Sequence, residues 1–135
     1  MAKRLPDKPS DLILLALHDL EAVEKDERYR VNVYAWHDPN GRCSVCLAGA
    51  VMAGTLGASP NVHRAPFMFD DDTRWKLRSL DALRAGSISE ALRYWVVDRP
   101  HTLPPYDEPT DYEHDPEGFK NDMAMLAGIL QAEGL

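Results

Sequence analysis

The amino-acid sequence predicts a compact, mainly α-helical fold of about four to five helices, formed as one domain by residues 1–135. Three observations lead to this prediction. Several segments carry apolar residues at the spacing of a helix face, and residues that cap helix N-termini precede them. The length of 135 residues suits one hydrophobic core. Residues 29–48 could add a minor β-hairpin.

The first helix is expected directly after Pro9. Ser10 can accept hydrogen bonds from the first amides of the helix, and the carboxylate of Asp11 meets the positive end of the helix dipole. Apolar residues then cover more than one stripe of the segment: Leu12, Ile13, Leu14, Leu15, Ala16, Leu17, Leu20 and Val23. A helix with such a wide apolar face needs neighbours on several sides, so we expect it in the centre of the domain.

Residues 29–36 are the candidate first strand of the hairpin, because apolar and polar side chains alternate there. The Asp-Pro-Asn-Gly sequence of residues 38–41 has the chemistry of a tight turn. Residues 43–56 could return as the second strand. Their alanine, methionine, leucine and small residues instead favour a tightly packed helix, which Gly57 would cap.

Three further helices are expected in the second half of the chain. One follows the acidic residues 70–72, contains Trp75 and ends near Gly86. The capping box that Ser87 and Glu90 form opens the next, so these two helices should pack as a hairpin. The last begins at the N-cap residue Asp115, and its apolar face is formed by Phe119, Met123, Leu126 and Leu130.

Residues 99–116 are expected to form an acidic, proline-rich loop. From residue 100 onward this segment holds five of the 10 prolines of the chain and no lysine or arginine. A negatively charged loop of this kind can contact a basic partner protein. Together with an aromatic residue beside the turn, its carboxylates are the candidate partner-binding residues: Trp36, Asp107, Glu108, Asp111 and Glu113.

Charge and composition exclude several classes of function. The chain has 15 lysines and arginines against 22 aspartates and glutamates, a net charge of −7, which disfavours binding to nucleic acid. The N-terminal residues lack the apolar run of a secretory signal. Residues 43–62 are uncharged, but their glycines and proline favour a buried helix and a turn over a membrane span. We therefore expect a cytoplasmic protein that binds neither membrane nor nucleic acid.

A zinc site is the main chemical alternative. Cys43 and Cys46 are spaced so that both thiolates can bind one ion, His37 could reach it across the turn, and His63 is the candidate fourth ligand. The same two thiols could instead be small buried core residues on one helix face, or a dithiol redox pair. A nucleophilic site would have to combine Cys46 with His37 and Asp38.

The remaining signals are weaker. The predicted helix hairpin invites a helix-turn-helix interpretation, but the second helix offers only Arg93 as an exposed base, which argues against DNA binding. The tryptophans Trp36, Trp75 and Trp95 are expected to anchor the core, and Trp36 could alternatively be a partly exposed binding residue.

Residues 36–53, with the sequence WHDPNGRCSVCLAGAVMA, resemble a segment of a family of small uncharacterised bacteriophage and prophage proteins. The resemblance extends from Ser10 to about Gly86. It implies a phage-type accessory protein in the cytoplasm of a bacterial host, and such proteins often act by binding other macromolecules. The sequence therefore favours a non-enzymatic protein-binding module. The alternatives are a small zinc-stabilised module and an enzyme whose pocket lies around Trp36, His37 and Cys46.

Overall fold

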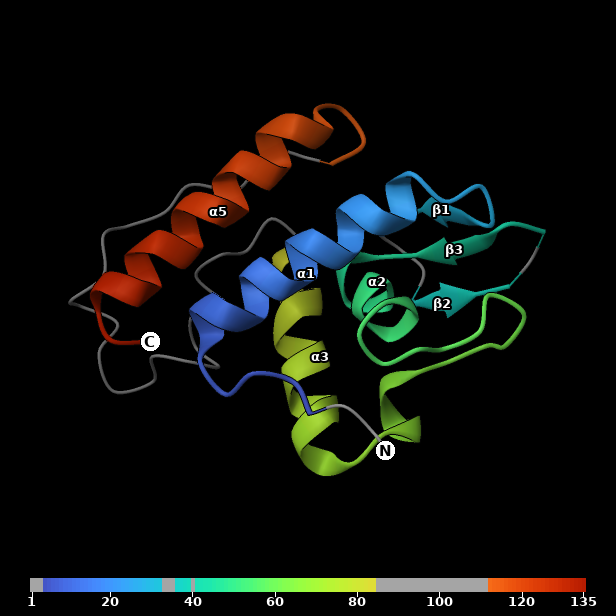
Figure 1. Ribbon diagram of the computed structural model, residues 1–135, viewed down its shortest axis with the longest axis horizontal. Coiled ribbons are helices and arrows are strands. Elements are labelled where there is room, and N and C mark those ends of the chain that lie inside the picture. The colour runs from blue at the N-terminus through green and yellow to red at the C-terminus, as the bar shows by residue number, and fades with distance from the viewer. Residues whose placement is uncertain (1–3, 33–35, 40, 85–111) are drawn as a thin grey trace.

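A computed structural model describes residues 4–32, 36–39, 41–84 and 112–135 of the chain (Figure 1). Four predictions therefore lie outside the described residues. They are the helix end near Gly86, the helix that begins at Ser87, most of the acidic loop, and residues 33–35 of the first predicted strand.

Within the described ranges, the chain forms four α-helices and a small three-stranded mixed sheet, which lies at one end of the molecule beside α1 and α2 (Figure 1). The elements in chain order are α1 (Pro9–Glu24), β1 (Tyr29–Val31), β2 (His37–Asp38), β3 (Cys43–Val45), α2 (Leu47–Ala53), the 3-10 helix η1 (Pro66–Met68), α3 (Asp71–Arg84) and α5 (Pro116–Ala132). The mainly helical character that the sequence predicts is confirmed. Of the helices that the structure describes, none is both long and apolar enough to cross a membrane.

The first helix, α1, is central, as its wide apolar face predicts. It packs against α5, α2, α3 and β1, and Leu12, Ile13 and Leu20 are buried. Ser10 is not the N-cap, so that prediction is wrong. The helix begins at Pro9, which suits the first helical position because it has no N–H to satisfy. The hydroxyl of Ser10 instead donates a 2.7 Å hydrogen bond to the carbonyl of Leu135 at the other end of the chain.

The sheet has the strand order β1-β3-β2, with β3 parallel to β1 and antiparallel to β2. The turn between β2 and β3 contains Gly41 at φ 77°, a conformation that glycine adopts without strain. Cys43 is therefore a strand residue, and the predicted continuous helix over residues 43–56 is wrong. Strand β3 pairs on both sides, so these three residues gain more backbone hydrogen bonds as a strand than as a helix end.

The helix that does follow the turn is α2, with Cys46 as its N-cap and Gly54 as its C-cap. Gly57, which was predicted to be the cap, lies beyond it. The carboxylate of Asp19 on α1 accepts a hydrogen bond from the backbone N–H of Thr55, so the chain leaves the helix at this point. Gly57 lies in the following turn at φ 71°.

Two predicted helix starts are confirmed. The carboxylate of Asp70 accepts a 2.8 Å hydrogen bond from the N–H of Thr73 at the start of α3, and that of Asp115 accepts a 3.0 Å bond from Gly118 in α5. All four residues of the predicted apolar face of α5 are buried: Phe119, Met123, Leu126 and Leu130.

Candidate functional site

His37 and Cys43 form a buried contact between two strands, β2 and β3. Their side chains are 0% and 1% exposed, and the Sγ atom lies 3.6 Å from Nδ1 and 3.7 Å from Nε2 of the imidazole. The ring of Tyr29 meets the imidazole edge-on, at 6.3 Å between centroids. The backbone N–H of Arg64 donates a hydrogen bond to the carbonyl of His37, which connects β2 to the segment between α2 and η1.

Both members of this pair are held in their neutral forms. Burial lowers the pKa of His37, opposed by a hydrogen bond between the ring and the backbone of Val62. Burial raises the pKa of the Cys43 thiol, and the nearby charge of Asp38 raises it further. A reactive cysteine needs a thiolate, which a nearby cation or a helix N-terminus normally stabilises. This geometry favours a structural pair over a nucleophile or a redox centre.

The four predicted zinc ligands occupy three different environments. His37 and Cys43 touch, whereas the thiol of Cys46 accepts a 3.3 Å hydrogen bond from the N–H of Gly49 and so caps α2. His63 is exposed. In the described ranges, no group of three or more His, Cys, Asp or Glu side chains could hold a metal ion. Zinc binding stays a prediction, which metal analysis of protein purified without chelator can test.

The predicted binding and anchor residues also differ in position. Trp36 is half-buried and packs against the core. Trp75 is 49% exposed, so the prediction that it anchors the core is wrong. The face of α3 that meets the core carries Leu77, Leu80 and Leu83, and Trp75 lies off that stripe. Trp95 and three candidate partner-binding residues, Asp107, Glu108 and Asp111, lie outside the described residues, whereas Glu113 is described and exposed.

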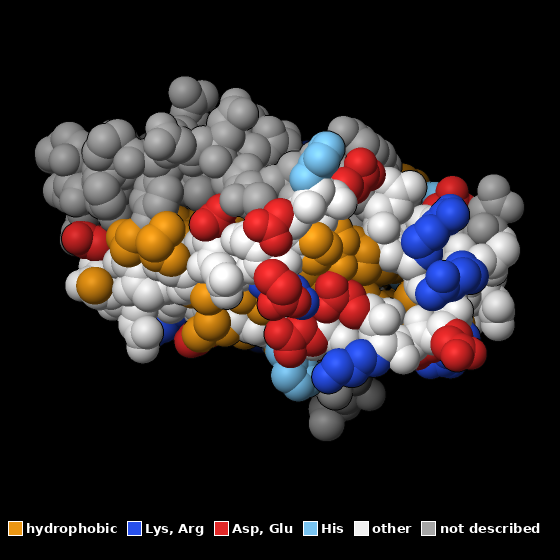
Figure 2. Space-filling model, turned by 90° about the horizontal axis from the view of Figure 1, so that it is seen from above, with side chains coloured by type: hydrophobic (Ala, Val, Ile, Leu, Met, Phe, Trp, Pro, Cys, Tyr) orange, Lys and Arg blue, Asp and Glu red, His pale blue; other side chains and the backbone are white. Residues whose placement is uncertain are grey.

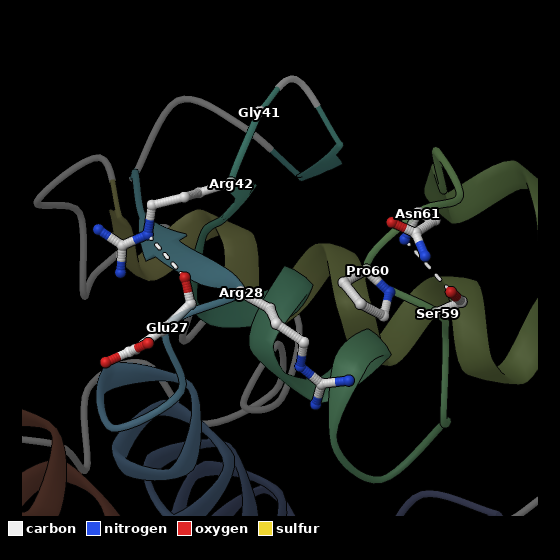
Figure 3. A pocket seen from close by; sticks show the side chains of 7 residues that line it. All are labelled: Glu27, Arg28, Gly41, Arg42, Ser59, Pro60 and Asn61. Carbon is white, nitrogen blue, oxygen red and sulfur yellow. Dashed lines mark hydrogen bonds between the residues drawn. The ribbon is translucent and has the colours of Figure 1, made fainter.

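A polar pocket of about 380 Å³ opens between the start of β1 and the segment that follows α2 (Figure 3). Its lining residues are Glu27, Arg28, Gly41, Arg42, Ser59, Pro60 and Asn61. The guanidinium of Arg28 binds the carboxylate of Asp26 at 2.7 Å. Figure 3 shows the side chains of Arg28 and Arg42 pointing in different directions. Small-molecule sites are usually lined by apolar side chains, so this pocket is not a typical one.

An exposed apolar surface is the feature that sequence reasoning missed. Phe67 and Met68 of η1 are 68% and 44% exposed, and Trp75 of α3, a helix that packs against η1, is 49% exposed; we call these three side chains the apolar surface. The 3-10 helix η1 packs against α3, and Phe69 contributes to the core while Phe67 faces outward. The Pro-Phe-Met-Phe sequence of residues 66–69 could have predicted an exposed apolar side chain, because a short turn cannot bury three consecutive large side chains on one side.

Comparisons of the chain with models of protein families, with curated proteins and with solved structures found no match. The resemblance of residues 36–53 to phage proteins therefore stays a prediction.

Acidification is expected to destabilise the fold through His37. The pKa of the folded imidazole lies below its ordinary value of 6.5, so below that pH the unfolded chain binds a proton that the folded chain does not. The free energy of unfolding should therefore fall as the pH drops from about 6.5 toward 4. The pKa values of Asp7, Asp26 and Asp70 are also lowered, and their stabilisation is lost progressively as the pH falls below about 5.

Urea titrations at each pH measure this slope. His37→Gln should flatten it between about pH 6.5 and 5, and His114→Gln, which changes an exposed histidine, should leave it unchanged. A slope that survives in His37→Gln would contradict the assignment.

Proposed function

We propose that this chain is a non-enzymatic protein-binding module of the phage accessory type. The observation that carries the proposal is the apolar surface of Phe67, Met68 and Trp75. Phe67 leaves 68% of its surface in water, which costs free energy that a partner could recover by covering it. Aromatic residues and methionine are enriched in the cores of protein interfaces, and tryptophan is a frequent hot spot.

Charged side chains next in sequence to the apolar surface could form its polar rim. Asp71 has a side chain that is 93% exposed, and Asp72 is 54% exposed. Interfaces commonly place such charges around an apolar centre, where they steer the partner and add salt dependence. At the apolar surface, these carboxylates and the net charge of −7 favour a basic region of the partner.

A catalytic function has less support. The buried pair of His37 and Cys43 is neutral and 0% to 1% exposed, so a substrate would have to displace core residues to reach it. In the polar pocket, the guanidinium of Arg28 is already bound to the carboxylate of Asp26.

The experiment is capture of partners from a lysate of the host by the immobilised chain, quantified by mass spectrometry. The double variant Phe67→Ser, Met68→Ser should reduce retention of a specific partner about tenfold or more, the effect of removing hot-spot residues. Retention should also fall as salt rises. Neutral amides at Asp107, Glu108, Asp111 and Glu113 should weaken it further if the acidic loop contributes.

A matched control is Met125→Ser, which removes a 53% exposed methionine from α5, away from η1 and α3. It should leave retention unchanged. Circular dichroism should be the same for the Phe67→Ser, Met68→Ser variant and for Met125→Ser, because all three changed side chains are exposed. A partner that is retained equally by the Phe67→Ser, Met68→Ser variant would show that the apolar surface is not the interface.

A further inference from the structure

Two arginines lie on the outer side of the sheet. The side chains of Tyr29, Cys43 and Val45 point to the buried side, and the residues that alternate with them, Arg30 and Arg42, are exposed. We call Arg30 and Arg42 the arginine pair. Figure 2 shows several lysine and arginine side chains at the end of the molecule where Figure 1 places the sheet, with acidic side chains beside them and across the middle of that face.

Neutral groups hold both guanidinium groups in place. Arg30 donates from Nε and Nη2 to the hydroxyl of Ser44, at 3.2 and 2.9 Å. Arg42 donates from Nε to the carbonyl of Glu27 at 2.9 Å and from Nη2 to that of Tyr29 at 2.5 Å. The side chain of Arg30 therefore reaches from β1 to β3, and that of Arg42, the residue before β3, reaches to the backbone at the start of β1.

The positive charges of the arginine pair differ in this respect from those of Arg28, Arg74 and Lys76, each of which lies in an ion pair. Arg28 is bound to Asp26, Arg74 to Asp71, and Lys76 to Asp7 and Asp72. Within the part of the chain that the structure describes, Arg30 and Arg42 form no ion pair, and Nη1 of each makes no hydrogen bond. A guanidinium has five N–H donors in a planar fork that matches the two oxygens of a carboxylate.

We propose that the arginine pair binds carboxylates of an acidic peptide segment in a partner protein. The surface is separate in sequence from the apolar surface, so it adds a second contact to the binding function proposed above. Because the guanidinium groups are already oriented by Ser44 and two backbone carbonyls, binding costs less side-chain entropy than it would for mobile arginines. The planar guanidinium of arginine can bind both oxygens of a carboxylate at once, which the compact ammonium group of lysine does less well.

An acidic peptide fits this surface better than a nucleic acid does. Nucleic acids carry phosphates along their whole length, and the net charge of −7 would repel those that lie beyond the arginine pair. A short peptide interacts only locally.

The test is fluorescence anisotropy at low salt with a labelled peptide of alternating glycine and glutamate. The full chain should bind it, and the same peptide with glutamine in place of glutamate should not bind. Arg30→Gln or Arg42→Gln should each weaken binding about threefold, and the double variant about tenfold, as expected for exposed ion pairs. Arg42→Lys keeps the charge and is the second variant, in case loss of the bonds to Glu27 and Tyr29 prevents folding. It should bind more weakly than the unchanged chain.

The matched control is Arg74→Gln, which removes the same charge from α3 and should change affinity less than twofold. Equal binding of the glutamine peptide, or unchanged affinity in the double variant, would overturn the proposal. So would tighter binding of a thymidine oligonucleotide that displaces the peptide, since the surface would then recognise phosphates. Failure of this test leaves the lysate capture by the apolar surface unaffected, so the two proposals fail independently.

Discussion

Gly49→Ala is expected to lower the free energy of unfolding by about 3 kcal/mol or more. A Cβ atom at this position would lie 1.6 Å from the carbonyl oxygen of Trp36 and 2.8 Å from its carbonyl carbon. Both are backbone atoms, so the clash can be relieved only by separating α2 from the segment that contains Trp36. A small domain has only about 5–15 kcal/mol of stability, so the variant should be largely unfolded or melt far below the unchanged chain.

Gly128→Ala is the matched control, because Gly128 is also a helical glycine. A Cβ atom added to it would project from α5 into open space, with no neighbouring atom within 4 Å. Alanine should therefore raise the free energy of unfolding by about 0.5–1 kcal/mol through its higher helix propensity. Urea denaturation followed by circular dichroism measures both. Similar stabilities for the two variants would show that Trp36 does not lie over Gly49.

Asp19→Ala is expected to cost about 2–3 kcal/mol of stability. Asp19 is 5% exposed, and its carboxylate accepts hydrogen bonds from the N–H of Thr55 at 3.1 Å and from the Thr55 hydroxyl at 2.6 Å. Removing the carboxylate leaves the backbone N–H of Thr55 without its acceptor. It also removes the hydrogen bonds that connect α1 to the turn after α2. Hydrogen bonds to charged groups are among the stronger ones, which sets the size of the effect.

Two controls test this assignment by urea denaturation. Asp19→Asn keeps one carbonyl oxygen for Thr55 and should cost less than alanine does. Glu21→Ala changes an exposed residue of the same helix and should stay within about 0.5 kcal/mol of the unchanged chain. If Asp19→Ala and Glu21→Ala gave the same stability, the bond between α1 and Thr55 would contribute nothing measurable.

The spacing of Cys43 and Cys46 shows how local reasoning can mislead. A Cys-x-x-Cys pair predicts two thiols on one helix face or around one metal, because both interpretations treat the segment as one uniform element. The structure places a strand end between them. Cys43 follows the alternation of β3 into the core beside His37, and Cys46 turns its sulfur to the N–H of Gly49.

The candidate sites were only partly predictable for the same reason. His37 and Cys43 were both identified as chemically interesting, and they are in contact. The apolar surface and the arginine pair were not identified. Exposure of Phe67 depends on how η1 packs against α3, and the orientation of Arg42 depends on which carbonyls β1 turns toward it.

Features that depend on residues three or four positions apart could be predicted from the amino-acid sequence alone. The capping bonds of Asp70 and Asp115 and the buried face of α5 are of this kind, because helical periodicity and capping are properties of a single turn of backbone. Three other features could be read only from the folded chain: β3 pairs on both sides, Gly49 lies against Trp36, and Trp75 faces outward. Those outcomes depend on contacts between segments distant in the chain, which the packing of the whole core selects.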